Sequence, residues 1–312
     1  MTVEYSRVKF LAPKLLLLVA VLSGCASNAR HNLAVEYYNL GNAYYKIKDY
    51  DRAIDFFQNS IEHDPELLHA HYNLSLALIQ QGRGAEANIA LLELLEKDPD
   101  NTAILQIIGY SLYVQGKGEE ALEVFDRILA LQTNDLNALY NRGIVLWELN
   151  RKIEAENSFR ELLGFVSSEN QELYPDTLFN LSKLLLEIGE KKEALGYLEE
   201  YVEWESNDIE GFKLLAQAYR AEENYGKALK TYEQILALDS EQSEIWMDKA
   251  EILLTKIEDP LAGLEAVDQA IILGFDDNKR FEDLLNDPGL VEKEALKAVL
   301  EQWDLLPEKI QQ

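Results

Sequence analysis

Three of the four histidines have the residue type and spacing closest to those of a chemical site. His63, His69 and His71 fall within nine residues, and neutral imidazole is the commonest metal ligand in proteins. In the helical repeat described below, however, His63 ends one helix, whereas His69 and His71 lie on different faces of the next. We therefore predict separate structural roles for these histidines and no metal site.

Two short segments, Gly82-Arg83-Gly84 and Gly116-Lys117-Gly118, have a basic residue between glycines and so could be considered as phosphate-binding loops. Neither follows a strand and neither has the Walker spacing, so we predict turns between helices, with glycine just past a helix end. The many carboxylates fall on helix faces that we expect to be solvated. We predict that the chain is not an enzyme and uses no cofactor.

Cys25 is the only cysteine in the chain, and its setting is specific. Three basic residues, Arg7, Lys9 and Lys14, precede an unbroken apolar run over 15–22. This run is too short to cross a bilayer as a helix, but it suits the apolar part of a signal peptide. A lone cysteine also excludes an internal disulfide bond.

The residues Leu22-Ser23-Gly24-Cys25 resemble the lipobox of bacterial lipoproteins. The resemblance implies that a signal peptide, residues 1–24, is removed. It also implies that the thiol receives a diacylglycerol and that the new amino group is acylated, for example with palmitate. Several acyl chains on one residue suffice for stable membrane anchoring. The alternative is an ordinary secretory signal followed by an incidental cysteine.

The segment after Cys25 predicts where the protein is held. We expect an exported protein, lipid-anchored to a bacterial membrane and facing the periplasm or cell envelope. Among enteric lipoproteins an Asp after the cysteine favours the inner membrane; Ala26 and Ser27 stand here, which slightly favours the outer membrane. Residues 25–33 form a short tether whose last eight residues span at most ~28 Å, so the next segment should lie close to the membrane.

The composition fits a helical and strongly acidic protein. The formal net charge is −27 at pH 7, from 29 basic and 56 acidic residues. Such a surface repels phosphate backbones, so we predict that no nucleic acid is bound. The chain is rich in Ala, Leu and Glu and poor in proline, as expected for an all-helical chain.

Small residues recur at a fixed period along most of the chain. The alanines Ala53, Ala87, Ala121 and Ala155 are 34 residues apart, Ala194 follows after 39 and Ala228 after another 34. Numbering each repeat from one, this alanine holds place 20, where two helices cross closely. Place 8 is also small, place 7 is apolar, place 24 is bulky, and a proline ends the first two repeats at place 32. Examples are Gly41 at place 8, Leu40 at place 7, Phe57 at place 24 and Pro65 at place 32.

This 34-residue pattern resembles the tetratricopeptide repeat (TPR) over 34–276. The resemblance implies an all-α, right-handed superhelix (an α-solenoid) of about seven helix–turn–helix repeats with a C-terminal helical cap. The predicted segments are TPR repeats one to four over 34–169, an insertion over 170–174, repeats five to seven over 175–276 and capping helices over 277–312. Repeat seven is degenerate, because Asp259-Pro260 interrupts the turn and Gly263 stands one residue late for the alanine.

In this family the first helix of each repeat lines a concave groove that binds partners. The places that line it predict a groove rich in rings, branched apolar side chains and amides, formed by Tyr38, Asn42, Tyr45, Tyr72, Asn73, Leu76, Ile79, Tyr110, Tyr113, Tyr140, Asn141, Ile144, Trp147, Phe179, Lys183 and Leu186. Place 12 is the most informative, since its side chains would otherwise face water: Tyr45, Ile79, Tyr113, Trp147 and Leu186. Repeats six and seven turn charged, with Lys213, Gln217, Arg220, Glu244, Asp248 and Glu251. The alternatives are occupancy by the protein's own terminal segment or by a second copy, and simple packing.

These features predict a membrane-anchored TPR adaptor, or scaffold, that recruits a protein or peptide partner to the bacterial cell envelope through its groove. Two alternatives stay open. One is a ligand-binding accessory protein of an envelope transporter, and the other is a self-assembling structural lipoprotein, for which self-association would be the function.

Overall fold

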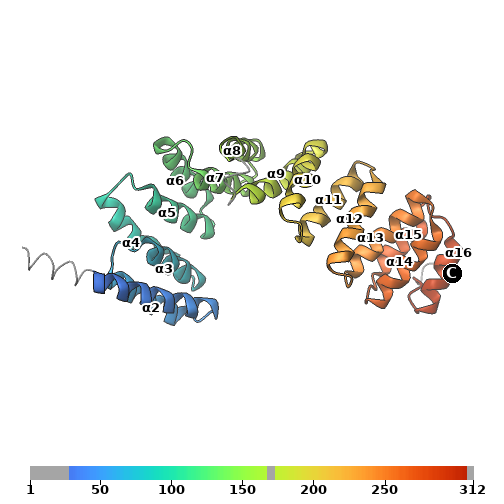
Figure 1. Cartoon of the computed structure of the whole chain (residues 1–312), viewed down its shortest axis with the longest axis horizontal. Helices are drawn as coiled ribbons and strands as arrows, with labels where there is room; N and C mark the ends of the chain where they lie inside the picture. Colours follow the sequence, from blue (N-terminus) through green and yellow to red (C-terminus); the bar gives the residue numbers. More distant parts are fainter. Residues whose placement is uncertain (1–27, 167–172, 308–312) are drawn as a thin grey trace, which may run out of the picture. The chain divides into compact units, whose positions relative to one another are not determined.

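The computed structural model describes residues 28–166 and 173–307. These residues form helices joined by short turns, with no strand in the described ranges, so the all-α prediction is confirmed (Figure 1). Arg7, Lys9, Lys14, the apolar run over 15–22 and the lipidation site predicted at Cys25 lie outside the described residues. Most of the predicted insertion at 170–174 does so too. None of the described helices is both long and apolar enough to cross a bilayer.

The chain divides into two compact units, here called the N-terminal unit (described residues up to Ser158) and the C-terminal unit (from Phe159). The N-terminal unit begins with a helix over 28–46, so residues 28–33, expected as part of the tether, belong to the first helix. The helices α2 (Tyr50–His63), α3 (Leu68–Gln80), α4 (Gly84–Lys97), α5 (Thr102–Val114), α6 (Gly118–Leu131) and α7 (Leu136–Glu148) follow it. Helix α8 (Lys152–Phe165) crosses the boundary between the units.

The C-terminal unit continues the same pattern of helix pairs. Its helices are α9 (Tyr174–Ile188), α10 (Lys191–Trp204), α11 (Ile209–Ala221), α12 (Tyr225–Leu238), α13 (Ser243–Ile252), the π-helical turn η1 (Leu253–Ile257), α14 (Pro260–Ile272), α15 (Asn278–Asn286) and α16 (Lys293–Gln302). Helices α9, α11 and α13 pack against α10, α12 and α14 respectively, as the first and second helices of a repeat should.

The small residues at places 8 and 20 allow the close helix crossings. Ala53, Ala121, Ala155, Ala194 and Ala228 are fully buried. A Cβ added to Gly41 would lie 2.5 Å from the Phe57 ring, a separation that no packed side chain tolerates. Because place 8 meets place 24 in this way, a bulky residue at place 24 of the second helix requires a small one at place 8 of the first. This requirement produces the repeat pattern in the sequence.

Leu40 departs from the prediction that place 7 is a packed position. It is 45% exposed, whereas Leu74 and Ile108 at the same place are 8% and 5% exposed. Leu74 lies in one cluster with Ala53 and Phe57 of the preceding repeat, so place 7 is covered by the repeat before it. No described helix precedes the helix over 28–46, and Leu40 is left uncovered by the described residues.

A π-helical turn explains the degenerate seventh repeat. Helix α13 continues into η1, and a π turn accommodates one residue more than an α turn, so Gly263 comes one residue late. Gly263 is buried, and a Cβ there would lie 2.6 Å from Cγ of Leu254. Asp259 caps α14 by accepting from the Ala262 backbone amide, and Pro260 opens that helix. The irregular sequence therefore still forms a packed helix pair.

The terminal helices α15 and α16 share a core with α13 and α14. Phe281, Leu284, Leu285, Leu296 and Leu300 are buried in one cluster with Leu254 and Val267. Trp303, just after α16, is 39% exposed and donates its Nε1 hydrogen to Asp268 Oδ1 at 2.8 Å.

Candidate functional site

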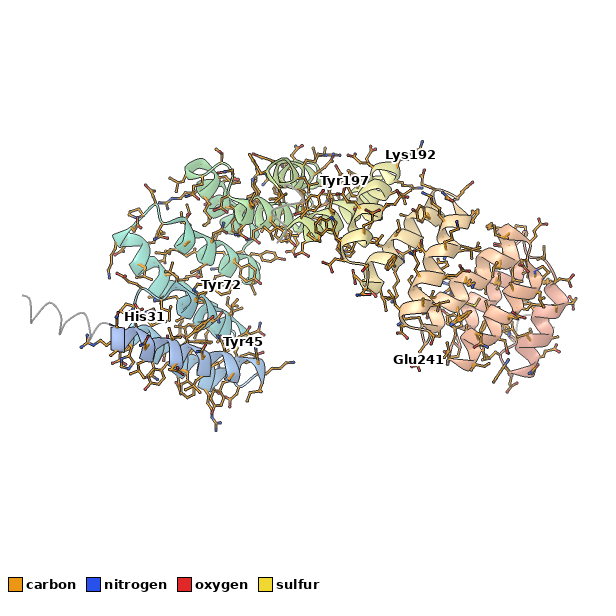
Figure 2. The ribbon with its side chains drawn as sticks, viewed as in Figure 1. His31, Tyr45, Tyr72, Lys192, Tyr197 and Glu241 are labelled. Carbon is orange, nitrogen blue, oxygen red and sulfur yellow. The ribbon has the colours of Figure 1, made fainter. Side chains whose placement is uncertain are left out.

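The predicted groove residues of the N-terminal unit have a uniform environment. All thirteen, from Tyr38 to Trp147, are partly buried, and none is either fully buried or fully exposed. Tyr45 and Tyr72 lie on consecutive first helices of the repeats (Figure 2). Partly buried rings and amides at a surface are typical of interaction sites. Some of these side chains are partly buried for another reason, because they also pack against the hydrophobic core.

That structural cause concerns place 12 above all. Tyr45 and Ile79, together with Tyr38, pack against the core cluster around Phe57 and Leu74, and Leu186 packs against the core cluster of the C-terminal unit. The idea that place-12 side chains would otherwise face water was therefore wrong for Tyr45, Ile79 and Leu186. Their apolar character is partly required by packing, which leaves the tyrosine hydroxyls and the amides as the more informative groups.

Tyrosines from successive helices contact one another across the N-terminal unit. The ring centroids of Tyr72 and Tyr110 are 5.8 Å apart, and those of Tyr110 and Tyr113 are 6.1 Å apart. Tyr113 donates its hydroxyl hydrogen to Glu148 Oε1 at 2.8 Å. The rings therefore form a continuous aromatic surface over α3 and α5, held at its far end by a carboxylate on α7.

Burial raises the pKa of three of these phenols, those of Tyr45, Tyr72 and Tyr113. It raises the pKa of Tyr72 to about 12, with smaller contributions from Tyr110 and Tyr45. Burial also raises the pKa of Tyr45, and burial together with the hydrogen bond to Glu148 raises that of Tyr113. Tyr113 already donates its one hydroxyl hydrogen to Glu148, so near neutral pH it can only accept a further hydrogen bond.

An amide bridge joins the first two repeats beside these rings. Asn73 on α3 donates from Nδ2 to Asn42 Oδ1 at 2.6 Å and to the Tyr38 hydroxyl at 3.3 Å. All three side chains are partly buried. The bridge fixes the amide planes, and fixed amides can pair with the backbone of an extended peptide at low entropic cost.

A hollow of about 380 Å³ lies at the starts of α3, α5 and α7. Its walls include Leu68, His69, Tyr72, Thr102, Ala103, Gln106, Ile107, Asp135 and Asn137. Gln106 donates from Nε2 to Asp135 Oδ1 at 2.8 Å, and the same oxygen accepts from the Ala138 backbone amide at 2.9 Å, capping α7. Oε1 of Gln106 is buried and accepts no hydrogen bond from the described residues. A ligand that donates a hydrogen bond would reach this oxygen only after the Gln106 side chain turns, because the atom has no exposed surface.

The C-terminal unit presents its predicted residues differently. Phe179 packs on Tyr201 with ring centroids 5.0 Å apart, and Nζ of Lys183 lies 5.5 Å from the Phe179 centroid. Tyr201 donates its hydroxyl hydrogen to Asp208 Oδ2 at 2.7 Å, and Asp208 also caps α11. Phe179 of α9 thus packs against Tyr201 near the end of α10, and Lys183 lies over the Phe179 ring.

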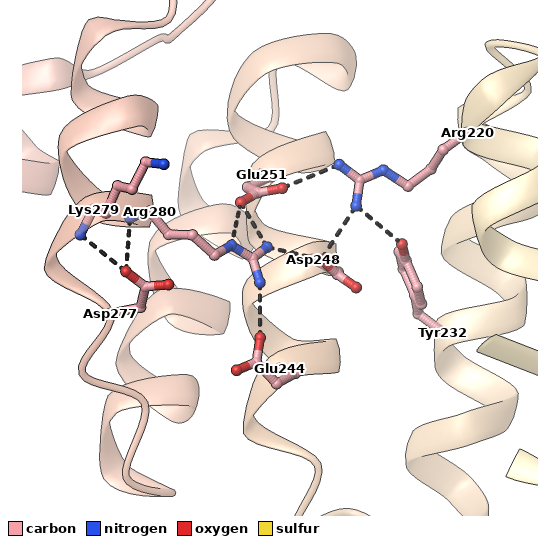
Figure 3. Close-up of polar contacts among 8 residues, drawn as sticks. All are labelled: Arg220, Tyr232, Glu244, Asp248, Glu251, Asp277, Lys279 and Arg280. Carbon is pink, nitrogen blue, oxygen red and sulfur yellow. Dashed lines mark hydrogen bonds and ion pairs between the residues drawn. The ribbon is translucent and has the colours of Figure 1, made fainter. Parts of the chain in front are cut away.

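Four of the residues predicted in repeats six and seven form an ion network with Arg280, which the sequence analysis did not include (Figure 3). Arg280 on α15 binds Glu251 Oε1 through Nη2 at 2.6 Å, Asp248 at 2.7 Å and Glu244 at 2.8 Å. Arg220 on α11 binds Glu251 Oε2 at 3.1 Å and Asp248 at 3.2 Å from the other side. The carboxylates of α13 are therefore held between two guanidinium groups.

The ion pairs of this network leave few of its charged groups available to bind a ligand. Burial alone would lower the pKa of Arg220, but Tyr232, Asp248 and Glu251 more than offset this and raise it. Burial raises the pKa of Tyr232 to about 12, and its neutral hydroxyl accepts from Arg220 Nη1 at 3.4 Å. We interpret this part of the predicted groove as structural, because its charges are paired within the unit.

The three histidines lie in separate environments, as expected. The His63 ring stacks on Tyr37 at 5.4 Å, Nε2 of His71 lies 2.9 Å from the Pro65 carbonyl oxygen, and His69 lies at the hollow. Within the described ranges no three His, Cys, Asp or Glu side chains gather to hold a metal.

Gln106, Asp135 and Glu148 are site residues that the sequence prediction missed. A signal was present for Gln106, because it interrupts a series of tyrosines at place 5 formed by Tyr38, Tyr72 and Tyr140. Asp135 and Glu148 gave no such signal, since acidic residues are common on these helices.

Comparisons with known proteins agree with the geometry. Family models described as tetratricopeptide repeat match residues 34–67, 68–87, 108–171, 175–208 and 209–252. The chain is a tetratricopeptide-repeat protein. YrrB, described as a TPR protein with an unusual peptide-binding site, superposes with a TM-score of 0.55 at 21% identity over 62% of this chain and 97% of its own. PilF of Pseudomonas aeruginosa gives a TM-score of 0.53 at 21% identity over 72% of this chain and 99% of its own.

The curated relatives of this TPR protein are distant and mostly longer. Rat DnaJ homolog subfamily C member 3 is 25% identical over 68% of this chain and 44% of its own length. Bovine BBSome complex member BBS4 is 24% identical over 84% and 49%. The chain thus spans about half the length of these two relatives. An uncharacterized lipoprotein of Treponema pallidum is 26% identical over 44% of this chain and 69% of its own length.

Proposed function

We propose that this TPR protein is a membrane-anchored adaptor of the bacterial cell envelope, and that it recruits a protein partner through the concave surface of its N-terminal unit. The observation that carries the proposal is the hollow at the starts of α3, α5 and α7, with Gln106 in its wall and the tyrosines of α3 and α5 beside it.

The chemistry of this surface suits an extended peptide segment. Tyr72 and Tyr110 offer ring faces for apolar side chains, and the Asn42–Asn73 bridge offers amides for a peptide backbone. Once the Gln106 side chain turns, a backbone N–H of the peptide is the simplest donor for its Oε1. The net charge of −27 favours encounter with a basic or neutral segment over an acidic one.

Two observations support the anchored location. Leu22-Ser23-Gly24-Cys25 has the lipobox pattern, and one relative is itself described as a lipoprotein. The predicted acyl chains on Cys25 would hold the protein at the membrane without a spanning helix.

The groove is tested by crosslinking in intact cells followed by purification of the complex. The variant pair Tyr72→Ala and Tyr110→Ala removes the ring contacts, and Ile89→Ala, an exposed apolar residue on α4, is the matched control. We expect one envelope protein to be captured by the wild type and by the control and lost from the pair. Circular dichroism checks that helix content is kept. Equal capture by all three proteins would contradict the groove.

The anchor is tested separately. We expect the mass of the mature protein to show acylated Cys25, and Cys25→Ala to accumulate as an unprocessed precursor. An unmodified thiol on a processed chain would instead support an ordinary secretory signal.

The hollow also favours a second candidate function, a ligand-binding accessory role for a transporter. A small molecule that donates to Gln106 Oε1 would fill it equally well. Native mass spectrometry of gently purified protein distinguishes the two functions, because only the accessory role predicts a retained small ligand.

A further inference from the structure

The helix over 28–46 and the turn after it carry three exposed apolar side chains, Leu33, Leu40 and Ile47, beside two rings that pack on α2. Leu33, Tyr37, Leu40 and Tyr44 are spaced by four and three residues, which places them on one side of the helix, and Ile47 lies in the turn that follows it. Leu33 is 42% exposed, Leu40 45% and Ile47 70%. We call these five residues, with Phe56 of α2, the end face.

The rings of the end face are held in fixed positions. Tyr44 stacks on Phe56 with centroids 5.2 Å apart and planes inclined by 10°, and Tyr37 lies 6.3 Å from Phe56. His31 Nδ1 lies 2.6 Å from Asp64 Oδ2 and so ties the start of the helix to the end of α2 (Figure 2). The end face is therefore a preformed surface that needs no rearrangement to bind.

The charge around the end face differs from that of the whole chain. Residues 28–56, which contain the end face, hold four basic residues (Arg30, Lys46, Lys48 and Arg52) and four acidic ones (Glu36, Asp49, Asp51 and Asp55), so this segment is neutral in a chain with a net charge of −27. The Arg52 guanidinium lies 5.4 Å from the Tyr44 ring centroid. Tyrosine, leucine and isoleucine flanked by Lys and Arg are the side chains that favour a lipid headgroup layer.

We propose that the end face lies on the lipid bilayer, so that the helix over 28–46 runs in the plane of the membrane. The inference rests on the proposed anchoring, because acyl chains on Cys25 would hold the helix start within a few residues of the lipid. Two residues, Ala26 and Ser27, separate Cys25 from residue 28, a reach of at most ~11 Å. Only a helix lying in the membrane plane brings both Leu33 and Ile47 to the headgroups.

The test places tryptophan probes in the full chain, purified from membranes and reconstituted in vesicles of phosphatidylethanolamine and phosphatidylglycerol with brominated acyl chains. Leu40→Trp and Ile47→Trp probe the end face, and Ile153→Trp, an exposed apolar site on α8, is the control. After the wild-type signal is subtracted, we expect the bromines to quench most of the added fluorescence at 40 and 47 and little of it at 153.

Quenching at 40 and 47 no stronger than at 153 would overturn the proposal. So would a probe signal that changes only with protein concentration, which would assign the end face to a second copy of the chain. The lipid on Cys25 is measured by mass on the same samples. An acylated Cys25 without quenching at 40 refutes the end face and leaves the anchor intact. Quenching at 40 and 47 with an unmodified Cys25 supports the end face and refutes the anchor.

Discussion

Asn73 on α3 donates its side-chain amide to Asn42 on the preceding first helix, at 2.6 Å. The bond crosses from one repeat to the next on the candidate binding surface. It therefore contributes both to the stacking of the repeats and to the shape that a partner would meet.

Asn42→Ala and Asn73→Ala should each lower the free energy of unfolding of the protein by about 1 kcal/mol. Because the two amides share one bond, the double variant should lose less than the sum of the single losses. Urea unfolding followed by circular dichroism measures this. Strict additivity would show that the bridge contributes nothing to stability.

The raised pKa of Tyr72 makes a prediction for alkaline pH. Its value is 10.0 in an unperturbed tyrosine and about 12 in the folded protein, so folding favours the protonated phenol. The resulting stability is fully present below pH 10 and is lost as the pH rises towards 12. Tyr72→Phe cannot ionise, so the free energy of unfolding of this variant should fall less steeply than that of the wild type over this window. Equal slopes would contradict the shift.

Gly263→Ala should destabilise the protein, although alanine holds the corresponding place in six other repeats. The added Cβ would lie 2.6 Å from Leu254, at a cost of about 1–3 kcal/mol for overpacking. Gly196→Ala in α10 is the control, since a Cβ there meets nothing within 4 Å, and it should stabilise by about 0.5–1 kcal/mol. Thermal unfolding should move the two variants in opposite directions.

Arg280→Gln should destabilise the C-terminal unit by about 1–3 kcal/mol, because Glu251 and Asp248 would each lose a charged partner. The control is Lys297→Gln, which breaks the exposed pair with Glu294 and should change stability by less than about 0.5 kcal/mol. Arg280→Lys should recover only part of the loss, since an ammonium cannot bind both carboxylates in the fork geometry. Similar losses for Arg280→Gln and Lys297→Gln would mean that the network contributes no more than a surface pair.

The helix pairs could be predicted from the sequence because their causes are local. Place 20 needs a small side chain where two helices cross, and the buried Ala53 and Ala194 meet that need. The exposure of Leu40 could not be predicted in this way, since it depends on which helix lies before it and not on its own residue type.

The candidate site was predicted less completely, for a related reason. Reading helix positions identifies which side chains face the groove, such as Tyr72 and Asn73, but not how they bond. The role of Arg280 depends on α15 packing beside α13, and the unsatisfied oxygen of Gln106 depends on where Asp135 caps the next helix. In each case the two bonded residues are about 30 positions apart in the sequence and lie on, or cap, different helices.

The double use of Asp135 Oδ1 links occupancy of the hollow to the order of α7. One oxygen holds both the Gln106 amide and the first turn of that helix. A guest that engages Gln106 Oε1 would polarise the amide and draw its Nε2 hydrogen closer to Asp135, at the expense of the bond to the Ala138 backbone amide. The hydrogen-exchange rate of the Ala138 backbone amide, measured by NMR, would then report binding without any label on the ligand.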